Sequence, residues 1–337
     1  MATIKDIARI TGVSATTVSN VVHGRSNRVS EETITKINNA IKELGYVPNM
    51  SARSLVAGSS KVIGFINHVV TDDNVNFLED PFHSAAIGII EHILRENGYY
   101  LMLRTVKSSE DLIEFLRNWN VAGLFFVGMF EDDFFETIKT INVPVVLIDS
   151  YVHSKKLCNV GLEDYNGSFL ATKHLIENGH KRIAFASPAI KEGGVLMERF
   201  LGYKAALLQS GIAFDQSLVG AYEMDIKSCE AAAKQIAAMD GVTGIVVTAD
   251  IMAAGIMAGL KRIGKDVPKD YSIVGFDDIN TCLLTSPTLT TIHQDMHEKG
   301  QKAVDYMIDL LEGNPIESYE TILPVSLISR NSVRNLL

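Results

Sequence analysis

From Lys61 onward, short apolar runs alternate with longer segments whose apolar residues recur at helical spacing. Seven runs are typical of buried strands: KVIGFIN, YLMLRT, GLFFVG, VPVVLID, RIAFAS, GIVVTA and SIVGFDD. The helical segments span 84–97, 109–118, 165–178, 199–210, 228–239, 252–263 and 295–312. Strands that are apolar along their whole length are covered on both faces, and strand–helix alternation gives right-handed parallel units. The pattern therefore predicts an α/β fold built on parallel, doubly wound sheets.

This pattern runs through twice, over about 62–162 and 163–290, which predicts two lobes with a ligand cleft between them. In such sheets, ligands bind outside the carboxyl ends of the strands. Several polar or aromatic residues fall at or near that edge: Asn67, His68, Asp80, Phe82, Asp149, Ser150, Arg199, Asp250, Asp277 and Asp278. From position alone these residues are candidates for ligand binding.

The first 60 residues follow a different pattern, with three short helical segments joined by turns. The first segment is capped by Thr3 and Asp6 and ends at Gly12. Ser14 caps the second, which runs to about residue 22, and Ser30 caps the third. Two short helices joined at a glycine and braced by a third make a helix-turn-helix, whose second helix enters the major groove of DNA. A three-helix bundle without a ligand is the alternative that periodicity alone leaves open.

Charge is distributed unevenly along the chain. Residues 1–60 contain seven basic and four acidic residues, a net charge of +3. The remainder contains 24 basic and 36 acidic residues, a net charge of −12, and the two parts add up to the −9 of the whole chain. This asymmetry is typical of a small nucleic-acid-binding module attached to an acidic body.

Other classes of function find little support. The three cysteines are far apart and have no metal-binding spacing, which indicates reduced, buried thiols. No phosphate-binding loop, dinucleotide fingerprint or nucleophile elbow occurs. The polar N-terminus does not look like a secretory signal, and no apolar run approaches the roughly 18 residues of a membrane span. We therefore expect a cytoplasmic protein that is not an enzyme and needs no metal or cofactor.

Ordered motifs along the whole chain resemble the LacI/GalR family of bacterial transcriptional repressors. The headpiece motifs are TIKDIARITGVSATTVSNVVHG and RVSEETITKINNAIKELGYVPNMSARSL; GHKRIAFAS, ERFLGYKAAL, GIVVTADIMAAGIM, DYSIVGFDD and SPTLTTIHQD follow in the body. The resemblance implies a DNA-binding headpiece over 1–47, a hinge segment over 48–60 and an effector-binding, dimerising body over 61–337. It further implies one lobe of about 61–162 and 293–322 and a second of about 163–290 and 323–337, as in periplasmic binding proteins.

The resemblance places three base-reading positions on the second helix, at Ala15, Thr16 and Asn20. Asn20 can pair with adenine through two hydrogen bonds, whereas the other two offer only a methyl group or a hydroxyl. Hydroxyls and arginines around them are expected to hold the DNA backbone. The residues expected to contact DNA are Thr3, Ser14, Ala15, Thr16, Thr17, Ser19, Asn20, Arg25, Arg28, Arg53 and Leu55.

Leu55 lies in the hinge segment, at the position where the family has a leucine that wedges into the minor groove. An apolar wedge unstacks a base step and bends the duplex, which gains contacts elsewhere. A short helix of this kind is marginal in water by itself. The alternative is that Leu55 merely belongs to a linker.

For the effector, the resemblance favours Arg199, Asp250 and Asp277 as polar anchors, since an arginine with carboxylates suits a polyhydroxylated ligand. A structural salt bridge for Arg199 and a turn or helix cap for Asp277 are the alternatives. Phe276 and Tyr222 fit an ordinary core at least as well as a ligand wall. The effector-binding residues we expect are Phe82, Asp149, Arg199, Tyr222, Asp250, Phe276 and Asp277.

Two departures from the family pattern affect the choice of effector. Ala249 precedes Asp250 where many members have an asparagine, and His83 stands where an aromatic residue is frequent. The missing asparagine removes a hydrogen-bond donor and acceptor from the cleft, which counts against a common hexose without excluding one. The resemblance as a whole favours a repressor that binds a palindromic operator as a homodimer, with a sugar-like effector. The choice between dimer and tetramer stays open. A sugar phosphate, a purine or a phosphoprotein as co-effector also stays open. A solute-binding protein is the less favoured alternative, because it would need a secretory signal and would have no use for residues 1–60.

Overall fold

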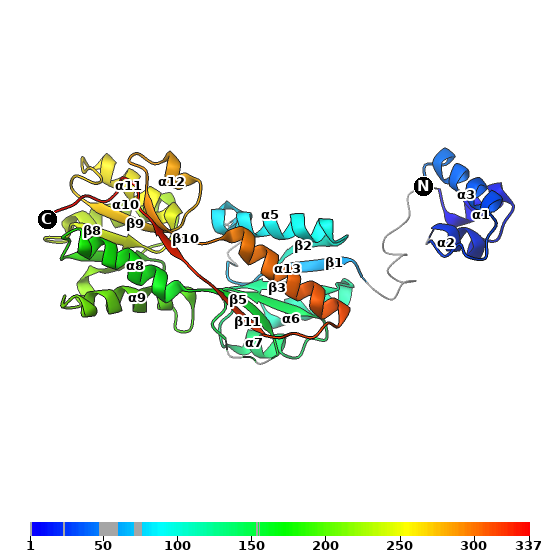
Figure 1. Ribbon diagram of the computed structural model, residues 1–337, viewed down its shortest axis with the longest axis horizontal. Coiled ribbons are helices and arrows are strands. Elements are labelled where there is room, and N and C mark those ends of the chain that lie inside the picture. The colour runs from blue at the N-terminus through cyan, green and yellow to red at the C-terminus, as the bar shows by residue number, and fades with distance from the viewer. Residues whose placement is uncertain (1, 23, 47–59, 71–75, 153, 155) are drawn as a thin grey trace. The chain divides into compact units, whose positions relative to one another are not determined.

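The computed structural model describes residues 2–22, 24–46, 60–70, 76–152, 154 and 156–337. The chain divides into two compact units, Met1–Lys61 and Val62–Leu337. Each unit has its own hydrophobic core, and the two are shown in Figure 1.

The N-terminal unit contains the helices α1 (Ile4–Thr11), α2 (Ala15–Val22) and α3 (Glu31–Glu43). Buried side chains from all three helices meet at the centre of this unit: Ile7, Val18, Ile37 and Ala40. The predicted capping box is confirmed, since the Thr3 side chain accepts from the amide of Asp6 while the Asp6 side chain accepts from that of Thr3. Gly12 adopts a φ of 68° at the turn, which only glycine adopts at low cost. The helix-turn-helix predicted from spacing is thus present.

The larger unit is built on two six-stranded sheets. The first has the strand order β11 (Glu320–Leu323), β5 (Cys158–Leu162), β4 (Val145–Ile148), β3 (Gly123–Val127), β1 (Val62–Asn67), β2 (Tyr100–Thr105). The second has the order β12 (Ser326–Ile328), β10 (Thr290–His293), β9 (Ser272–Asp277), β8 (Gly244–Val247), β6 (Ile183–Ser187), β7 (Val219–Ala221). In the first sheet β1 pairs with β2 in parallel, with Val62 opposite Tyr100 and Asn67 opposite Thr105.

The sheets are parallel as predicted, with one exception: β12 runs antiparallel to β10. The two sheets define two lobes, which we call the first lobe and the second lobe. Helices of the first lobe are α5 (Pro81–Glu96), α6 (Ser109–Asn118), α7 (Asp133–Ile138) and α13 (Met296–Glu312), with the short helix η1 (Phe77–Glu79). Those of the second are α8 (Asp164–Glu177), α9 (Val195–Gln209), α10 (Ile226–Ala238), α11 (Asp250–Arg262) and α12 (Thr281–Leu284), with η2 (Gln216–Leu218).

Helices cover both faces of each sheet, which is why the strands are apolar along their length. In the first lobe α5 and α13 lie side by side (Figure 1). Alternate residues of β1 show the consequence: Ile63 and Phe65 belong to one core cluster and Ile66 to another. In the second lobe α8 packs along α9, and α10 packs along α11.

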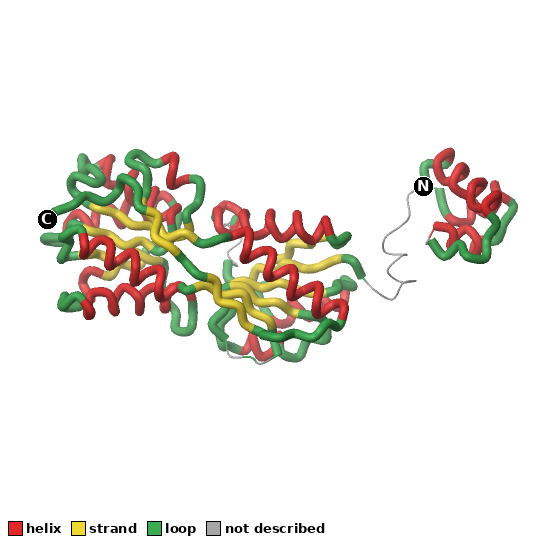
Figure 2. The backbone as a smooth tube through the Cα atoms, in the orientation of Figure 1, coloured by secondary structure: helices red, strands yellow, loops and turns green. Residues whose placement is uncertain are grey.

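The chain passes between the lobes three times. It does so between β5 and α8, between β10 and α13, and between β11 and β12, as can be followed in Figure 2. The residues at the crossings are few: Glu163, then Gln294 and Asp295, then Pro324 and Val325. Side chains at these points lie between the two lobes, so their contacts depend on how the lobes are arranged.

Close packing of α8 on α9 depends on Gly202. A Cβ atom at this position would clash with the backbone oxygen of Tyr165, on the facing helix. We expect Gly202→Ala to lower the free energy of unfolding by about 1–3 kcal/mol, because the rigid backbones must separate. Gly88→Ala is the matched control, since nothing lies within 4 Å of its added Cβ on α5. It should be neutral or raise the stability by about 0.5–1 kcal/mol. Denaturant unfolding measures both; equal effects would contradict the prediction.

Candidate functional site

The second helix of the N-terminal unit presents a polar surface. Val18 faces the core, whereas Ala15 and Thr16 are exposed and Asn20 is half-buried. Ser14 accepts from the amide of Thr17 at 3.0 Å, which fixes the start of the helix. The hydroxyls of Ser14 and Thr17 also lie 2.9 Å apart, so these two predicted phosphate contacts are a hydrogen-bonded pair.

An open groove of about 620 Å³ runs along this helix. Its lining residues are Val13, Thr17, Asn20, Gly24, Arg25, Asn27, Arg28, Val29, Ser30 and Thr33. The groove thus brings together Thr17, Asn20, Arg25 and Arg28 from the predicted DNA-contacting set, with both arginines exposed. Thr3 lies elsewhere, at the start of α1, where its hydroxyl is bonded to Asp6 at 2.7 Å. Arg53 and Leu55 lie outside the described residues.

The second candidate site lies between the two lobes, at the carboxyl ends of strands from both sheets and near the segments where the chain crosses between the lobes. Asp149, directly after β4, has a φ of 48°, and Asp277, at the end of β9, has a φ of 112°. Left-handed backbone in a residue other than glycine costs energy and tends to persist at functional sites. Because β4 and β9 occupy the same place in the strand orders of their sheets, the two aspartates lie at corresponding positions in the two lobes.

Arg199 is the centre of the second-lobe half of this site. It is 7% exposed, and its Nε donates to Asp164 Oδ1 at 2.8 Å. Its Nη1 donates to the backbone oxygen of Thr248 and lies 3.9 Å from Asp277 Oδ1. The guanidinium stacks on Phe276, with its carbon 3.5 Å from the ring centre. These contacts fix the plane of the Arg199 guanidinium. Its other N–H groups can still donate to a ligand.

Asp277 lies next to this arginine and is itself nearly buried. Burial raises its pKa to about 8, because the positive charge of Arg199 offsets only part of the cost of removing the carboxylate from water. Gln294, on the second crossing, donates its amide Nε2 to Asp277 Oδ1 at 2.7 Å. A ligand hydroxyl could replace either Arg199 or Gln294 as the partner of this carboxylate.

The first-lobe half of the site is built around Asp149. Both of its carboxylate oxygens lie 2.7 Å from the ammonium nitrogen of Lys299, on α13. That nitrogen also donates to Gln294 Oε1 at 2.6 Å and lies 5.3 Å from the centre of the Phe82 ring. The two halves are therefore joined through Gln294. A second bridge runs from the hydroxyl of Tyr151, in the first lobe, to Asp164 Oδ2 at 2.7 Å.

Two predicted effector residues, Asp250 and Tyr222, have their contacts within the second lobe. Asp250 is fully buried, and its oxygens accept from the Thr291 hydroxyl at 2.6 Å and from the Ile279 amide at 3.1 Å. It ties α11 to β10 and to the loop after β9. Tyr222 lies in the core cluster on the α10 and α11 face of the second sheet, where its hydroxyl has no hydrogen-bond partner among the described residues.

Four residues at this site were not found by sequence reasoning: Tyr151, Asp164, Gln294 and Lys299. One of them had a visible signal. Lys299 stands four residues before Ala303 and eight before Met307, on the buried stripe of α13. A lysine in an apolar stripe needs a buried partner, and that alone could have pointed to it.

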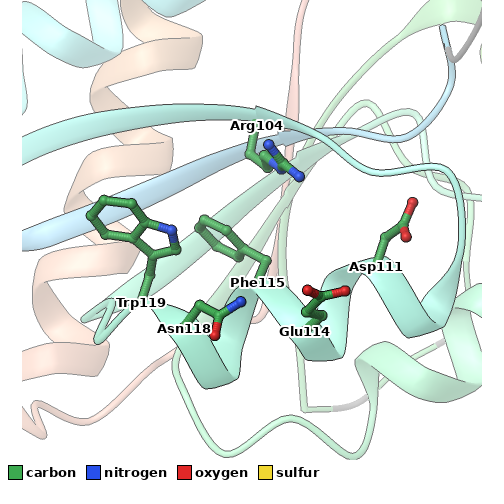
Figure 3. A pocket seen from close by; sticks show the side chains of 6 residues that line it. All are labelled: Arg104, Asp111, Glu114, Phe115, Asn118 and Trp119. Carbon is green, nitrogen blue, oxygen red and sulfur yellow. The ribbon is translucent and has the colours of Figure 1, made fainter.

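A separate small cavity of about 130 Å³ lies beside α6. Its lining residues, shown in Figure 3, are Arg104, Asp111, Glu114, Phe115, Asn118 and Trp119. None of the predicted effector residues is among them. Across the described ranges, no group of three or more histidine, cysteine or acidic side chains could hold a metal ion, and no helix is long and apolar enough to cross a membrane.

Comparisons with known proteins match both units. Residues 3–49 match the description "Bacterial regulatory proteins, lacI family", and residues 172–333 match "Periplasmic binding protein-like domain". The transcriptional repressor PurR of Vibrio campbellii is 32% identical over 100% of both chains. The regulator CelR of Thermobifida fusca is 30% identical over 98% of both, and MalR of Clostridium butyricum 32% over 99% of both.

Solved structures agree with this. The lac repressor dimer bound to operator and the anti-inducer ONPF has a TM-score of 0.84, with 26% identity over 99% of both chains. A complex of the regulator CelR with cellobiose has a TM-score of 0.73, with 27% identity over 98% of this chain and 100% of the other.

Proposed function

This chain belongs to the lacI family of bacterial regulatory proteins, and from that premise we propose that it represses transcription by binding a palindromic operator as a homodimer. The observation that carries the proposal is the groove along α2. It combines a side chain able to read a base, Asn20, with two exposed arginines able to bind phosphates, Arg25 and Arg28. A dimer with two-fold symmetry matches an operator with the same symmetry. We propose the bacterial cytoplasm as the place of action, because the operator is there.

The test is the salt dependence of DNA binding by the full chain. Binding to a random duplex should weaken steeply with salt, since each phosphate contact releases counter-ions. Arg25→Ala should reduce the slope of log affinity against log salt concentration by about 1 for each phosphate contact that is lost. Lys261→Ala is the control, because that exposed lysine pairs with Asp266 on the second lobe. Fluorescence anisotropy measures both, and an absence of binding at low salt would exclude the proposed function.

Exposed apolar side chains support the homodimer. Ile226 is 72% exposed at the start of α10, and Leu284 is 82% exposed on α12, next to exposed Leu283. Side chains of this kind on the lobe of a soluble regulator are suited to an interface between copies.

We propose a sugar-like effector for the site around Arg199. The planar guanidinium, its remaining N–H groups and the Asp277 carboxylate can bind neighbouring hydroxyls in fixed directions, and the apolar face of Phe276 can pack against a sugar ring. The relative CelR, which binds cellobiose in its solved structure, supports this class of ligand. A purine is the second candidate, because several relatives are named PurR. Binding, with no catalytic step, is the proposed role of the site.

The proposed mechanism couples the site to DNA through the arrangement of the lobes. Asp149 and Lys299 belong to the first lobe, Arg199 and Asp277 to the second, and Gln294 touches both sets. A ligand that replaces some of these contacts favours one arrangement of the lobes over another. Such a ligand changes operator affinity only by as much as its own affinity differs between the two arrangements.

A further inference from the structure

The ammonium group of Lys299 is completely satisfied inside the protein. It has three N–H donors, and three acceptors surround it: both oxygens of Asp149 at 2.7 Å and Gln294 Oε1 at 2.6 Å. The residue is 2% exposed, and the Phe82 ring lies on one side of it. Lys299 therefore has no donor left for a ligand.

The other buried cation of the site is compensated as well. Arg199 is hydrogen-bonded to Asp164, whose side chain has no exposed surface, and it faces Asp277 as a second carboxylate. Each cation thus already has a carboxylate of its own, Asp149 for Lys299 and Asp164 for Arg199, and Asp277 adds a third acidic side chain. A phosphate brought into this site would find no cation without an anionic partner.

Lys299 also fixes the direction of Gln294. Because the ammonium can only donate, it holds the amide oxygen, and the amide nitrogen is turned to Asp277 at 2.7 Å. One amide N–H remains to donate to a ligand oxygen. Without Lys299, the amide could turn over and present its oxygen to Asp277 instead.

We propose that Lys299 is a specificity-determining residue: it serves as a built-in counter-ion for Asp149, orients Gln294, and so makes the site select an uncharged effector over a phosphorylated one. This inference rests on the proposed function, because it concerns the same effector site. It gives Lys299 a role through Asp149 and Gln294 and not through direct contact with the ligand.

The first experiment needs no effector. Lys299→Ala removes three methylene groups and the ammonium, which together have the shape of n-propylammonium. We expect a lower melting temperature for this variant, since Asp149 is left buried without a counter-ion. n-Propylammonium chloride should raise that melting temperature more than equal concentrations of sodium chloride or 1-propanol do. Wild type and the double variant Asp149→Asn/Lys299→Ala should show no such difference; equal effects on all three proteins would overturn the proposal.

The second experiment tests selectivity by thermal shift, because a ligand that binds only the folded state raises the melting temperature. The probes are matched sets: ribose with ribose 5-phosphate, glucose with glucose 6-phosphate and glucosamine, and cellobiose with its 6-phosphate. Wild type should respond to an uncharged member and not to its phosphorylated partner. Lys299→Met keeps the volume of the side chain but not its charge, so its response should move from glucose towards glucosamine, whose ammonium can face Asp149.

The outcomes separate the two proposals. A larger shift of wild type with a phosphorylated sugar than with its parent would overturn the role of Lys299. An unchanged preference in Lys299→Met would do so as well, whereas a merely structural lysine would alter the melting temperature without altering the preference. If no sugar moves wild type, the sugar effector of the proposed function is contradicted, and the n-propylammonium experiment still decides whether Lys299 fills an ammonium site.

Discussion

Replacing Arg199 with methionine is expected to lower the free energy of unfolding by about 3–5 kcal/mol, because it leaves a buried carboxylate without its partner. Asp164 has no exposed side-chain surface, and its Oδ1 accepts from Arg199 at 2.8 Å. Among the described residues, the other side-chain donor to this carboxylate is the hydroxyl of Tyr151, which is uncharged. The stacking of the guanidinium on Phe276 is lost at the same time.

Urea denaturation measures this loss, and the double variant Asp164→Asn/Arg199→Met is its control. Removing both charges should restore much of the stability, since the uncompensated ion accounts for most of the cost. Arg182→Met is a second control, because that arginine pairs with Asp215 near the surface, where such pairs contribute about 0–1 kcal/mol. A single variant as stable as wild type would contradict the prediction that the Arg199–Asp164 pair is needed for stability.

The dual role of Arg199 changes how its function must be tested. A residue that bound only the effector could be replaced with loss of the response and with operator binding intact. Here the same side chain also holds Asp164 at the start of α8, next to the first crossing between the lobes. The response to an effector should therefore be compared between Arg199→Met and the double variant, in which the buried ion is absent.

Much of the fold could be predicted because its signals are local. The apolar run of β3 and the helical spacing of α6 are complete within ten residues, and the Thr3 cap depends on residues three apart. The short strands β7 and β12 have only three residues each, too few to show a period. The antiparallel direction of β12 depends on how the chain enters the second lobe at the last crossing. That is a property of the tertiary structure, and the residues of the strand do not encode it.

The candidate site was harder to predict because its contacts join distant parts of the chain. Lys299 and Asp149 are 150 residues apart, and Arg199 and Asp164 are 35 apart. Position at a strand end made Asp149 and Asp277 candidates for ligand binding, but it could not distinguish them from Asp250. That aspartate also follows a strand, yet it starts α11 pointing at Thr291 and the Ile279 amide. The partners separate the two cases: Asp149 and Asp277 contact Lys299 and Gln294, whereas Asp250 contacts groups of its own lobe. The local sequence does not contain these partners.

Asn20→Ala is expected to cost about 1–3 kcal/mol of operator affinity in each half-site, which is about 2–6 kcal/mol for a palindrome bound by a dimer. Asn20 is the one residue among the three predicted base-reading positions whose side chain can form two hydrogen bonds with an adenine. It lies in the groove that Arg25 and Arg28 also line. Binding to random DNA should change little, because the arginines and the backbone contacts stay in place.

Anisotropy titrations with an operator selected from a random library, and with an unrelated duplex, measure the two affinities. Asn38→Ala is the matched control: it makes the same change at an exposed position of α3 that is absent from the groove. Equal losses on both duplexes would mean that Asn20 binds the DNA backbone. A small loss on the operator alone would shift the source of specificity to the bending of the duplex, since Ala15 and Thr16 offer few groups for base recognition.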